Sequence, residues 1–143
     1  MKMYRIIPLW DTTLLYLSHV FMNEVDRMVL VSRLEDVPTE KVELEDVSDT
    51  YIQWLITKEK QGAPNFAMRR FVMKPGGRIG LHHHPWEHEI FILSGEGVVM
   101  GPEGMEKHVV PGNFVFVPPD EIHGYRNDGT EDFVFLCMIP YKD

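Results

Sequence analysis

The chain has 143 residues, 44% of them hydrophobic and 25% charged, which is typical of one globular domain with a sizeable core. The formal net charge of −8 argues against nucleic acid or an anionic membrane as a partner, because both would repel the protein. A single cysteine, Cys137, excludes an internal disulfide framework and a cysteine-rich zinc site, and it fits the reducing cytoplasm.

Residues 1–34 are expected to form a helical or extended segment ahead of the main domain, which covers residues 35–143. Asp11 is a candidate N-cap for a short helix, and one face of that helix is predicted to carry Leu14, Leu17, Phe21, Val25 and Met28. Such an apolar stripe has to be buried, and a second subunit is one candidate for covering it. An alternative interpretation is that Met28 is the true start of the protein.

From residue 35 to 49 the chain is acidic and turn-rich, so we expect a solvated lead-in. Short strands are predicted beyond it, at 51–56, 66–73, 90–93, 98–100, 108–110, 114–117, 122–126 and 133–139. A loop is expected at 60–64 and a turn at 75–77, and Ser94–Gly97 is predicted to be a tight hairpin that pairs the strands on either side. Turn residues about every 8–12 positions predict an all-β sandwich or barrel.

Four histidines have a spacing that predicts a metal site. His82 and His84 are two residues apart, so on a strand they project from the same face, whereas on a helix they would lie roughly 200° apart. His88 follows at an even offset, and His123 comes several strands later. Imidazole ligands suit manganese, iron, cobalt, nickel, copper and zinc better than calcium or magnesium.

The histidines belong to two longer patterns of fixed spacing. The first runs Gly76, five residues, His82-x-His84, three residues, His88, six residues and Gly95. The second runs Gly112, five residues, Pro118-x-Asp120, two residues, His123, three residues and Asn127. Together they resemble the two motifs of the cupin superfamily, and the histidine-rich segment is similar to small single-domain cupins with four-histidine sites. The resemblance implies an all-β, double-stranded β-helix, that is, a jelly-roll barrel.

The sequence departs from the family pattern at two positions. Asp120 stands where the second motif has glycine, and aspartate tolerates the left-handed backbone conformation better than most residues. The family's metal-binding glutamate falls on His88 or, at the longer spacing, on Glu89. Counting six residues back from Gly95 gives His88, and strand alternation then places His88 and Ile90 on the same face. His88 is therefore the expected fourth ligand, and Glu89 is the alternative.

The resemblance also suggests which residues line a pocket beside the metal. Phe135 and Cys137 share one face of the last strand and are expected to face the metal, with Ile79 near the mouth of the barrel. Tyr125 shares a face with His123 and could donate a hydrogen bond to a substrate. The alternative is that Phe135 only fills the core. Arg69 or Arg70 has to face inward and could bind an anionic substrate, although the preferred interpretation is that both are surface charges.

We expect a cytoplasmic, metal-dependent oxidoreductase of the dioxygenase kind that acts on a small oxygen-bearing organic molecule. A homodimer is expected, with manganese or iron preferred over nickel, copper, cobalt or zinc as the metal. Because one fold hosts many chemistries, two alternatives stay open. One is a non-catalytic sensor of a metal or small molecule, and the other is an isomerase or epimerase.

Overall fold

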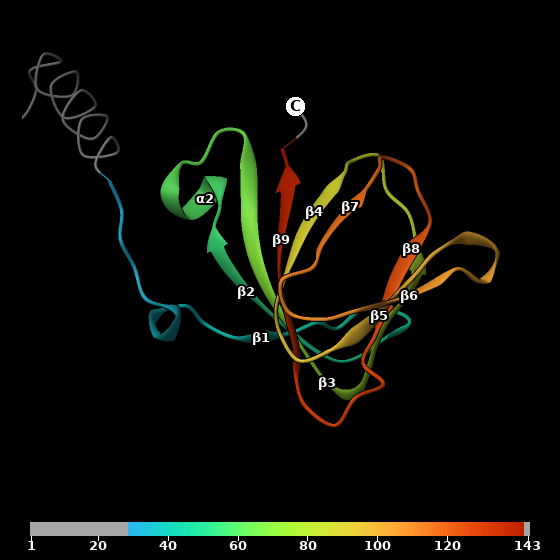
Figure 1. Ribbon diagram of the computed structural model, residues 1–143. Helices are drawn as coiled ribbons and strands as arrows, with labels where there is room; N and C mark the ends of the chain where they lie inside the picture. The colour runs from blue at the N-terminus through green and yellow to red at the C-terminus, as the bar shows by residue number, and fades with distance from the viewer. Residues whose placement is uncertain (1–28, 142–143) are drawn as a thin grey trace, which may run out of the picture. The chain divides into compact units, whose positions relative to one another are not determined.

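The structure is a computed structural model that describes residues 29–141 of the chain (Figure 1). The chain divides into two units, Met1–Ser32 and Arg33–Asp143. Of the first unit only residues 29–32 are described, and they have no regular secondary structure. The helix predicted after Asp11 and the alternative start at Met28 lie outside the described residues.

The second unit is nearly all β. Its strands are β1 (Glu40–Lys41), β2 (Val47–Ile56), β3 (Phe66–His82), β4 (His88–Ser94), β5 (Gly97–Met100), β6 (Glu106–Val109), β7 (Phe114–Val117), β8 (His123–Arg126) and β9 (Phe133–Pro140). Its helices have one turn each, namely η1 (Leu34–Asp36), α2 (Lys58–Gln61) and η2 (Pro102–Gly104). No helix within residues 29–141 is long and apolar enough to cross a membrane.

The strands form one curled antiparallel sheet in the order β6-β5-β8-β3-β9-β4-β7, and β2 joins β1 to β3 beside it (Figure 1). Strands that are distant in sequence lie side by side, because β3 pairs with both β8 and β9. The predicted all-β fold of the double-stranded β-helix type is confirmed.

The longest strand, β3, belongs to two parts of the sheet. Its first part pairs with β9, and its last part pairs with β8, where His82 lies opposite His123. Gly76, at the bend between them, has φ +82°, a left-handed conformation that glycine adopts without strain. The turn predicted at residues 75–77 is therefore a bend within one strand, where the N–H of Gly76 donates to the carbonyl of Asn127 (2.9 Å).

The predicted hairpin between β4 and β5 is wrong. β4 pairs with β7 and β9, whereas β5 pairs with β6 and β8. The connection passes close to the start of β9. A Cβ added at Gly95 would overlap the carbonyl oxygen of Asp132, and a Cβ added at Gly97 would overlap the ring of Phe133. The glycines that suggested a tight turn are required by this crossing instead.

Aromatic rings form the centre of the core. Phe135 is buried, and its ring centroid lies 5.2 Å from that of Phe71, 5.1 Å from Phe133 and 5.4 Å from Tyr125. A fully buried side chain of this kind stabilises the fold by about 1.5–3 kcal/mol, so this cluster contributes strongly to holding β3, β8 and β9 together.

Short regular elements occur in two segments that were expected to be irregular. The loop predicted at residues 60–64 begins inside α2, which is capped by Thr57 because its hydroxyl oxygen accepts from the N–H of Lys60 (3.1 Å). The lead-in contains η1 and β1, and β2 starts at Val47, four residues before its predicted start. Most of the lead-in is exposed, but Val42 packs against the core.

Candidate metal centre

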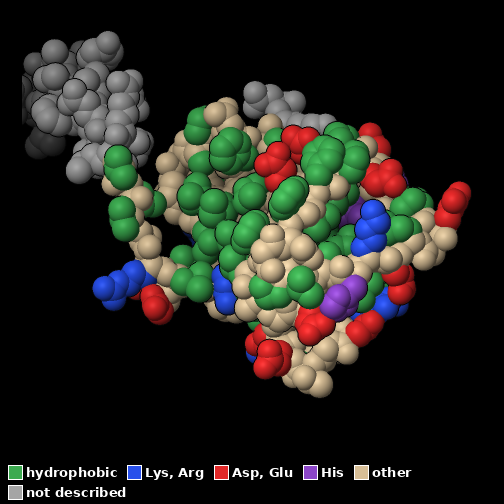
Figure 2. All heavy atoms as spheres, in the orientation of Figure 1, with side chains coloured by type: hydrophobic (Ala, Val, Ile, Leu, Met, Phe, Trp, Pro, Cys, Tyr) green, Lys and Arg blue, Asp and Glu red, His purple; other side chains and the backbone are tan. Residues whose placement is uncertain are grey.

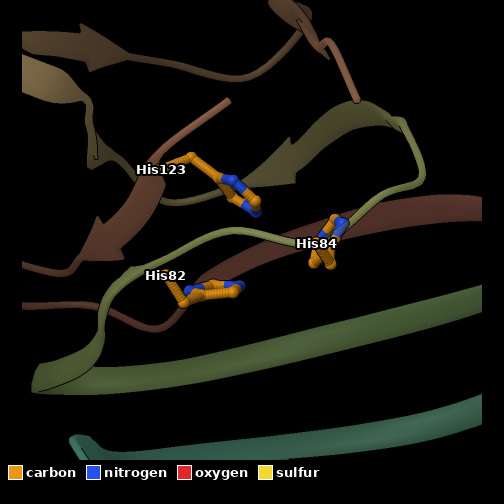
Figure 3. Close-up of side chains that lie close together, drawn as sticks. All are labelled: His82, His84 and His123. Carbon is orange, nitrogen blue, oxygen red and sulfur yellow. The ribbon is translucent and has the colours of Figure 1, made fainter. Parts of the chain in front are cut away.

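Histidine side chains from three parts of the chain meet where β3, β4 and β8 lie together. His82 ends β3, His84 lies in the following loop, His88 begins β4 and His123 begins β8. One ring nitrogen from each of His82, His84 and His123 lies within 4.8 Å of the other two. Figure 3 shows these three side chains pointing toward a common space. Pairing between β3 and β8 brings the two distant motifs together.

Backbone carbonyls fix the orientation of the three rings. The Nδ1 atom of His82 lies 2.9 Å from the carbonyl oxygen of Gly80, that of His84 lies 2.7 Å from Trp86, and that of His123 lies 2.8 Å from Glu121. A carbonyl oxygen only accepts hydrogen bonds, so each Nδ1 carries the proton and each Nε2 keeps its lone pair. Metal-binding histidines commonly have such a partner on the second nitrogen.

Two of the three Nε2 atoms are buried without a hydrogen-bond partner. The Nε2 atoms of His84 and His123 are both buried and unpaired. Buried polar atoms are almost always satisfied, and an unpaired one needs an explanation such as a bound ion. A cation between the rings would accept these lone pairs, so the chemistry of the donor set fits a metal.

His88, the fourth histidine, lies next to this cluster but outside the group of three. Its ring centroid is 4.3 Å from that of His84 and 5.0 Å from that of His123, and its Nδ1 atom lies 3.4 Å from the hydroxyl of Tyr125. His88 is buried, as strand alternation predicts, whereas Glu89 is exposed on the opposite face of β4. The alternative ligand is therefore not brought to the cluster.

Burial keeps the rings of His84, His88 and His123 neutral. Desolvation lowers the pKa of His84, that of His123 to about 4 and that of His88 to about 2. The positive charge of Arg69 adds to the shift of the His88 pKa. Imidazole binds a metal only in its neutral form, so these side chains are ready to act as ligands at neutral pH. Burial also raises the pKa of Tyr125 well above its ordinary value, so its hydroxyl stays a hydrogen-bond donor.

Trp86 supports the cluster from the loop between His84 and β4. Its ring stacks on that of His84 with a centroid separation of 4.5 Å and an interplanar angle of 6°. Its carbonyl is also the acceptor for the Nδ1–H of His84. Trp86 therefore holds the ring of His84 both by stacking and through its backbone.

A cavity of about 250 Å³ adjoins the histidines. His82 and His88 contribute to its wall, as do all four residues that the sequence suggested for a pocket, Ile79, Tyr125, Phe135 and Cys137. Most of the wall is apolar or aromatic. A ligand here would be held mainly by nonpolar contacts, with a few polar groups to orient it.

Arg69 also lines this cavity, which corrects the interpretation of both arginines as surface charges. Its guanidinium lies over the rings of Trp54 and Phe71, and one of its nitrogens lies 3.0 Å from the sulfur of Cys137. Arg70 faces the other side of β3 and donates to the side-chain oxygen of Gln53 (2.8 Å). Arg69 shares its face of β3 with the core residue Phe71, two positions later.

The lead-in also contributes to the cavity, through Val42, Leu44 and Val47. It was expected to be only a solvated segment because its charge is high. The alternation of Val42 and Leu44 with charged residues was the signal that could have revealed a cavity wall.

A second, larger cavity of about 510 Å³ lies along β6 and β7, but His123 is the one cluster histidine that reaches it.

Comparisons with known proteins agree with this architecture. A family model described as "Cupin domain" matches residues 69–139. The oxalate-binding protein of Thermotoga maritima is 35% identical over 86 residues, which are 59% of this chain and 70% of that protein. The glucose-6-phosphate isomerase of Pyrococcus horikoshii is 33% identical over 120 residues, covering 74% and 62% of the two chains. The quercetin 2,3-dioxygenase of Bacillus subtilis is 31% identical over 65 residues, covering 46% and 19%.

A solved structure is similar over most of its length. The polyketide cyclase RemF of Streptomyces resistomycificus has a TM-score of 0.76 and 31% identity, and the match covers 80% of this chain and 81% of that one. The chain spans less than two thirds of the isomerase and of the dioxygenase. The matches to the family model, to the oxalate-binding protein and to the cyclase structure, on a jelly-roll sheet with clustered histidines, show that the chain belongs to the cupin superfamily.

Proposed function

We propose that this cupin is a metal-dependent enzyme that acts on a small oxygen-bearing organic molecule, and that His82, His84, His88 and His123 bind a divalent transition metal. The observation that carries the proposal is the pair of buried, unpartnered Nε2 atoms on His84 and His123. With His82 they would place three lone pairs in one small space. A cation is the simplest group that turns this arrangement into a favourable one.

His88 completes the proposed ligand set. Its ring lies beside those of His84 and His123, and its burial keeps it neutral. Four imidazoles and no carboxylate leave the double positive charge of the ion uncompensated. This favours the lower oxidation state of a redox metal and the binding of an anionic substrate. We expect manganese or iron, with nickel, cobalt, copper and zinc as alternatives, because imidazole suits all of them.

We propose an oxidoreductase of the dioxygenase kind as the activity. A metal held here would supply Lewis acidity and, if redox-active, electron transfer. The chain's own residues bind and orient the substrate: the apolar walls exclude water, and the protonated hydroxyl of Tyr125 is available to donate a hydrogen bond. The likeness to a quercetin dioxygenase over 65 residues supports this activity.

A non-redox reaction, isomerisation or cyclisation, is the second candidate. It is supported by the likeness to a polyketide cyclase over 80% of this chain and to a glucose-6-phosphate isomerase. Oxygen uptake separates the two candidates. Metal-loaded protein is given catechol, diketone and flavonoid substrates in air and under nitrogen. Oxygen consumption that depends on substrate supports the oxidoreductase, and turnover that continues under nitrogen supports the non-redox reaction.

Metal analysis tests the ligand assignment directly. Wild-type protein and a His82→Ala, His123→Ala double variant are purified identically, and bound metal is measured by mass spectrometry. We expect a near-complete loss of metal from the double variant. His83→Ala is the matched control, because His83 lies between two proposed ligands but is exposed. Undiminished metal in the double variant would refute the assignment.

We also propose that the protein works in the cytoplasm as a homodimer. The single cysteine is compatible with a reducing compartment.

A further inference from the structure

Arg69 is a cation inside the cavity that lacks an anionic partner. No ion pair within residues 29–141 includes Arg69. Its Nε atom is buried and has no hydrogen-bond partner, and one terminal nitrogen contacts only the thiol of Cys137. A partly buried guanidinium without a carboxylate partner is unfavourable, because it has lost part of its hydration and gained no opposite charge.

The position of Arg69 follows from the strand register. Arg69 lies opposite Trp54 on β2 and opposite Cys137 on β9, so these three side chains form one row across the sheet. The guanidinium carbon lies 5.6 Å from the ring centroid of Trp54 and 5.1 Å from that of Phe71. These rings hold the guanidinium in place by cation–π contacts, and neither the rings nor the thiol neutralises it.

The cavity wall contains no group that could neutralise it either. Among the described residues, those that line the cavity include no aspartate or glutamate. The whole chain nevertheless carries a formal net charge of −8. The cavity therefore contains one cation without an opposite charge, and this cation favours an anion as the bound group.

The rest of the wall limits the size and character of the anion. The cavity volume of about 250 Å³ is below the roughly 300–1,000 Å³ of pockets for drug-sized ligands. Its walls are aliphatic and aromatic, with His82 and His88 on the side of the histidine cluster. The cavity therefore suits a small molecule with an apolar body whose charged group reaches Arg69.

We propose that Arg69 binds the carboxylate of a small, mainly apolar organic acid, while the body of the acid lies against the aromatic wall and its far side faces the histidines. A guanidinium is suited to this role because it presents paired N–H donors that match a carboxylate. The contact of the acid with a metal rests on the proposed function. The contact with Arg69 does not require the metal.

The test uses metal-free, ¹⁵N-labelled full-length protein titrated with benzoate and followed by NMR. We expect shifts at cavity residues, and we expect Arg69→Gln to weaken benzoate binding by about 10- to 100-fold, as charge-assisted hydrogen bonds typically contribute that much. Arg70→Gln is the matched control, because it removes the same charge from the opposite face of β3 and should leave binding unchanged. Equal affinity of wild type and Arg69→Gln would overturn the proposal.

Benzamide, the neutral analogue of benzoate, gives a second measurement that needs no variant. Wild-type protein should bind benzamide at least tenfold more weakly than benzoate, and equal binding would overturn the proposal even if Arg69→Gln did not fold.

The metal content of each protein is measured separately. Loss of benzoate binding in Arg69→Gln with unchanged metal supports the carboxylate site. A wild-type protein that takes up no metal but binds benzoate through Arg69 would refute the proposed function alone.

Discussion

At the level of single residues, the histidine cluster depends on how each ring is oriented before any ligand arrives. Each Nδ1 is bonded to a carbonyl two residues away in its own segment, so short-range geometry selects the tautomer. Burial also lowers the pKa of His84 and of His123, which keeps these two rings neutral. The side chains therefore need little reorganisation when a cation binds, because the donor atoms already face one another.

The pKa of His123 makes the stability of the metal-free protein depend on pH. The folded protein keeps His123 neutral down to about pH 4, whereas the unfolded chain protonates it near pH 6.5. Between these values the unfolded state binds more protons, so the free energy of unfolding falls as the pH falls. We expect a loss of up to about 2 kcal/mol from this residue between about pH 7.5 and pH 5, measured by urea unfolding. His123→Asn should flatten the profile, and an unchanged slope would contradict the prediction.

Asn127 is a second residue whose role can be tested alone. It is fully buried, and its amide donates to the carbonyls of Met73 and Glu131 (2.8 Å each) while its oxygen accepts from the N–H of Gly129. Asn127→Ala leaves these groups unsatisfied, so we expect it to lower the free energy of unfolding by about 2–4 kcal/mol. Asn113→Ala is the control, because exposed Asn113 accepts one bond (2.9 Å). Equal losses in chemical denaturation would contradict the assigned role.

At the level of elements, the crossing from β4 to β5 is the connection most sensitive to substitution. Gly95 has φ +67°, and an added Cβ would overlap the backbone of Asp132, which cannot move aside easily. We expect Gly95→Ala to destabilise the protein by about 3 kcal/mol or more. Gly104→Ala is matched in backbone conformation, with φ +75°, but has open space around it. Its cost should be about 1 kcal/mol, and similar melting temperatures for the two variants would exclude the close approach.

The elements also show what the sequence could and could not reveal. Fixed spacing predicted that His82, His84 and His123 would come together, and they do, although His84 lies in the loop after β3 and not on the strand face that was expected for it. The pairing of β4 was not encoded locally, since Gly95 serves a hairpin and a crossing equally well. The inward position of Arg69 was missed because alternation alone leaves two equivalent phases, and only the partners on β2 and β9 choose between them.

At the level of the whole molecule, an apolar surface supports the expected homodimer. β4 and β7 expose Phe91, Leu93, Phe114 and Phe116 on their outer face, and Phe114 is 82% exposed. Figure 2 shows hydrophobic side chains gathered on the face that these strands and β9 present. Phe91 and Phe114 are cross-strand partners, so the patch is continuous. Patches of this kind commonly mark protein interfaces.

Light scattering coupled to gel filtration tests the dimer. We expect wild-type protein to have twice the mass of one chain and Phe114→Asp to have the mass of one chain, because an unpaired charge at a dry interface is strongly unfavourable. Ile56→Asp is the control, since Ile56 is an exposed apolar residue at the end of β2, away from β4 and β7. A monomeric wild type at micromolar concentration, or a dimeric Phe114→Asp, would refute this interface.

The bent strand β3 carries both Arg69 and His82, and both side chains line one cavity. Their separation is thus set by a single continuous backbone. It fixes the length of a ligand that contacts both side chains at once. Val42 and Leu44, by contrast, come from the lead-in ahead of β2. A substitution in the lead-in would therefore reshape the cavity without changing the separation of Arg69 and His82.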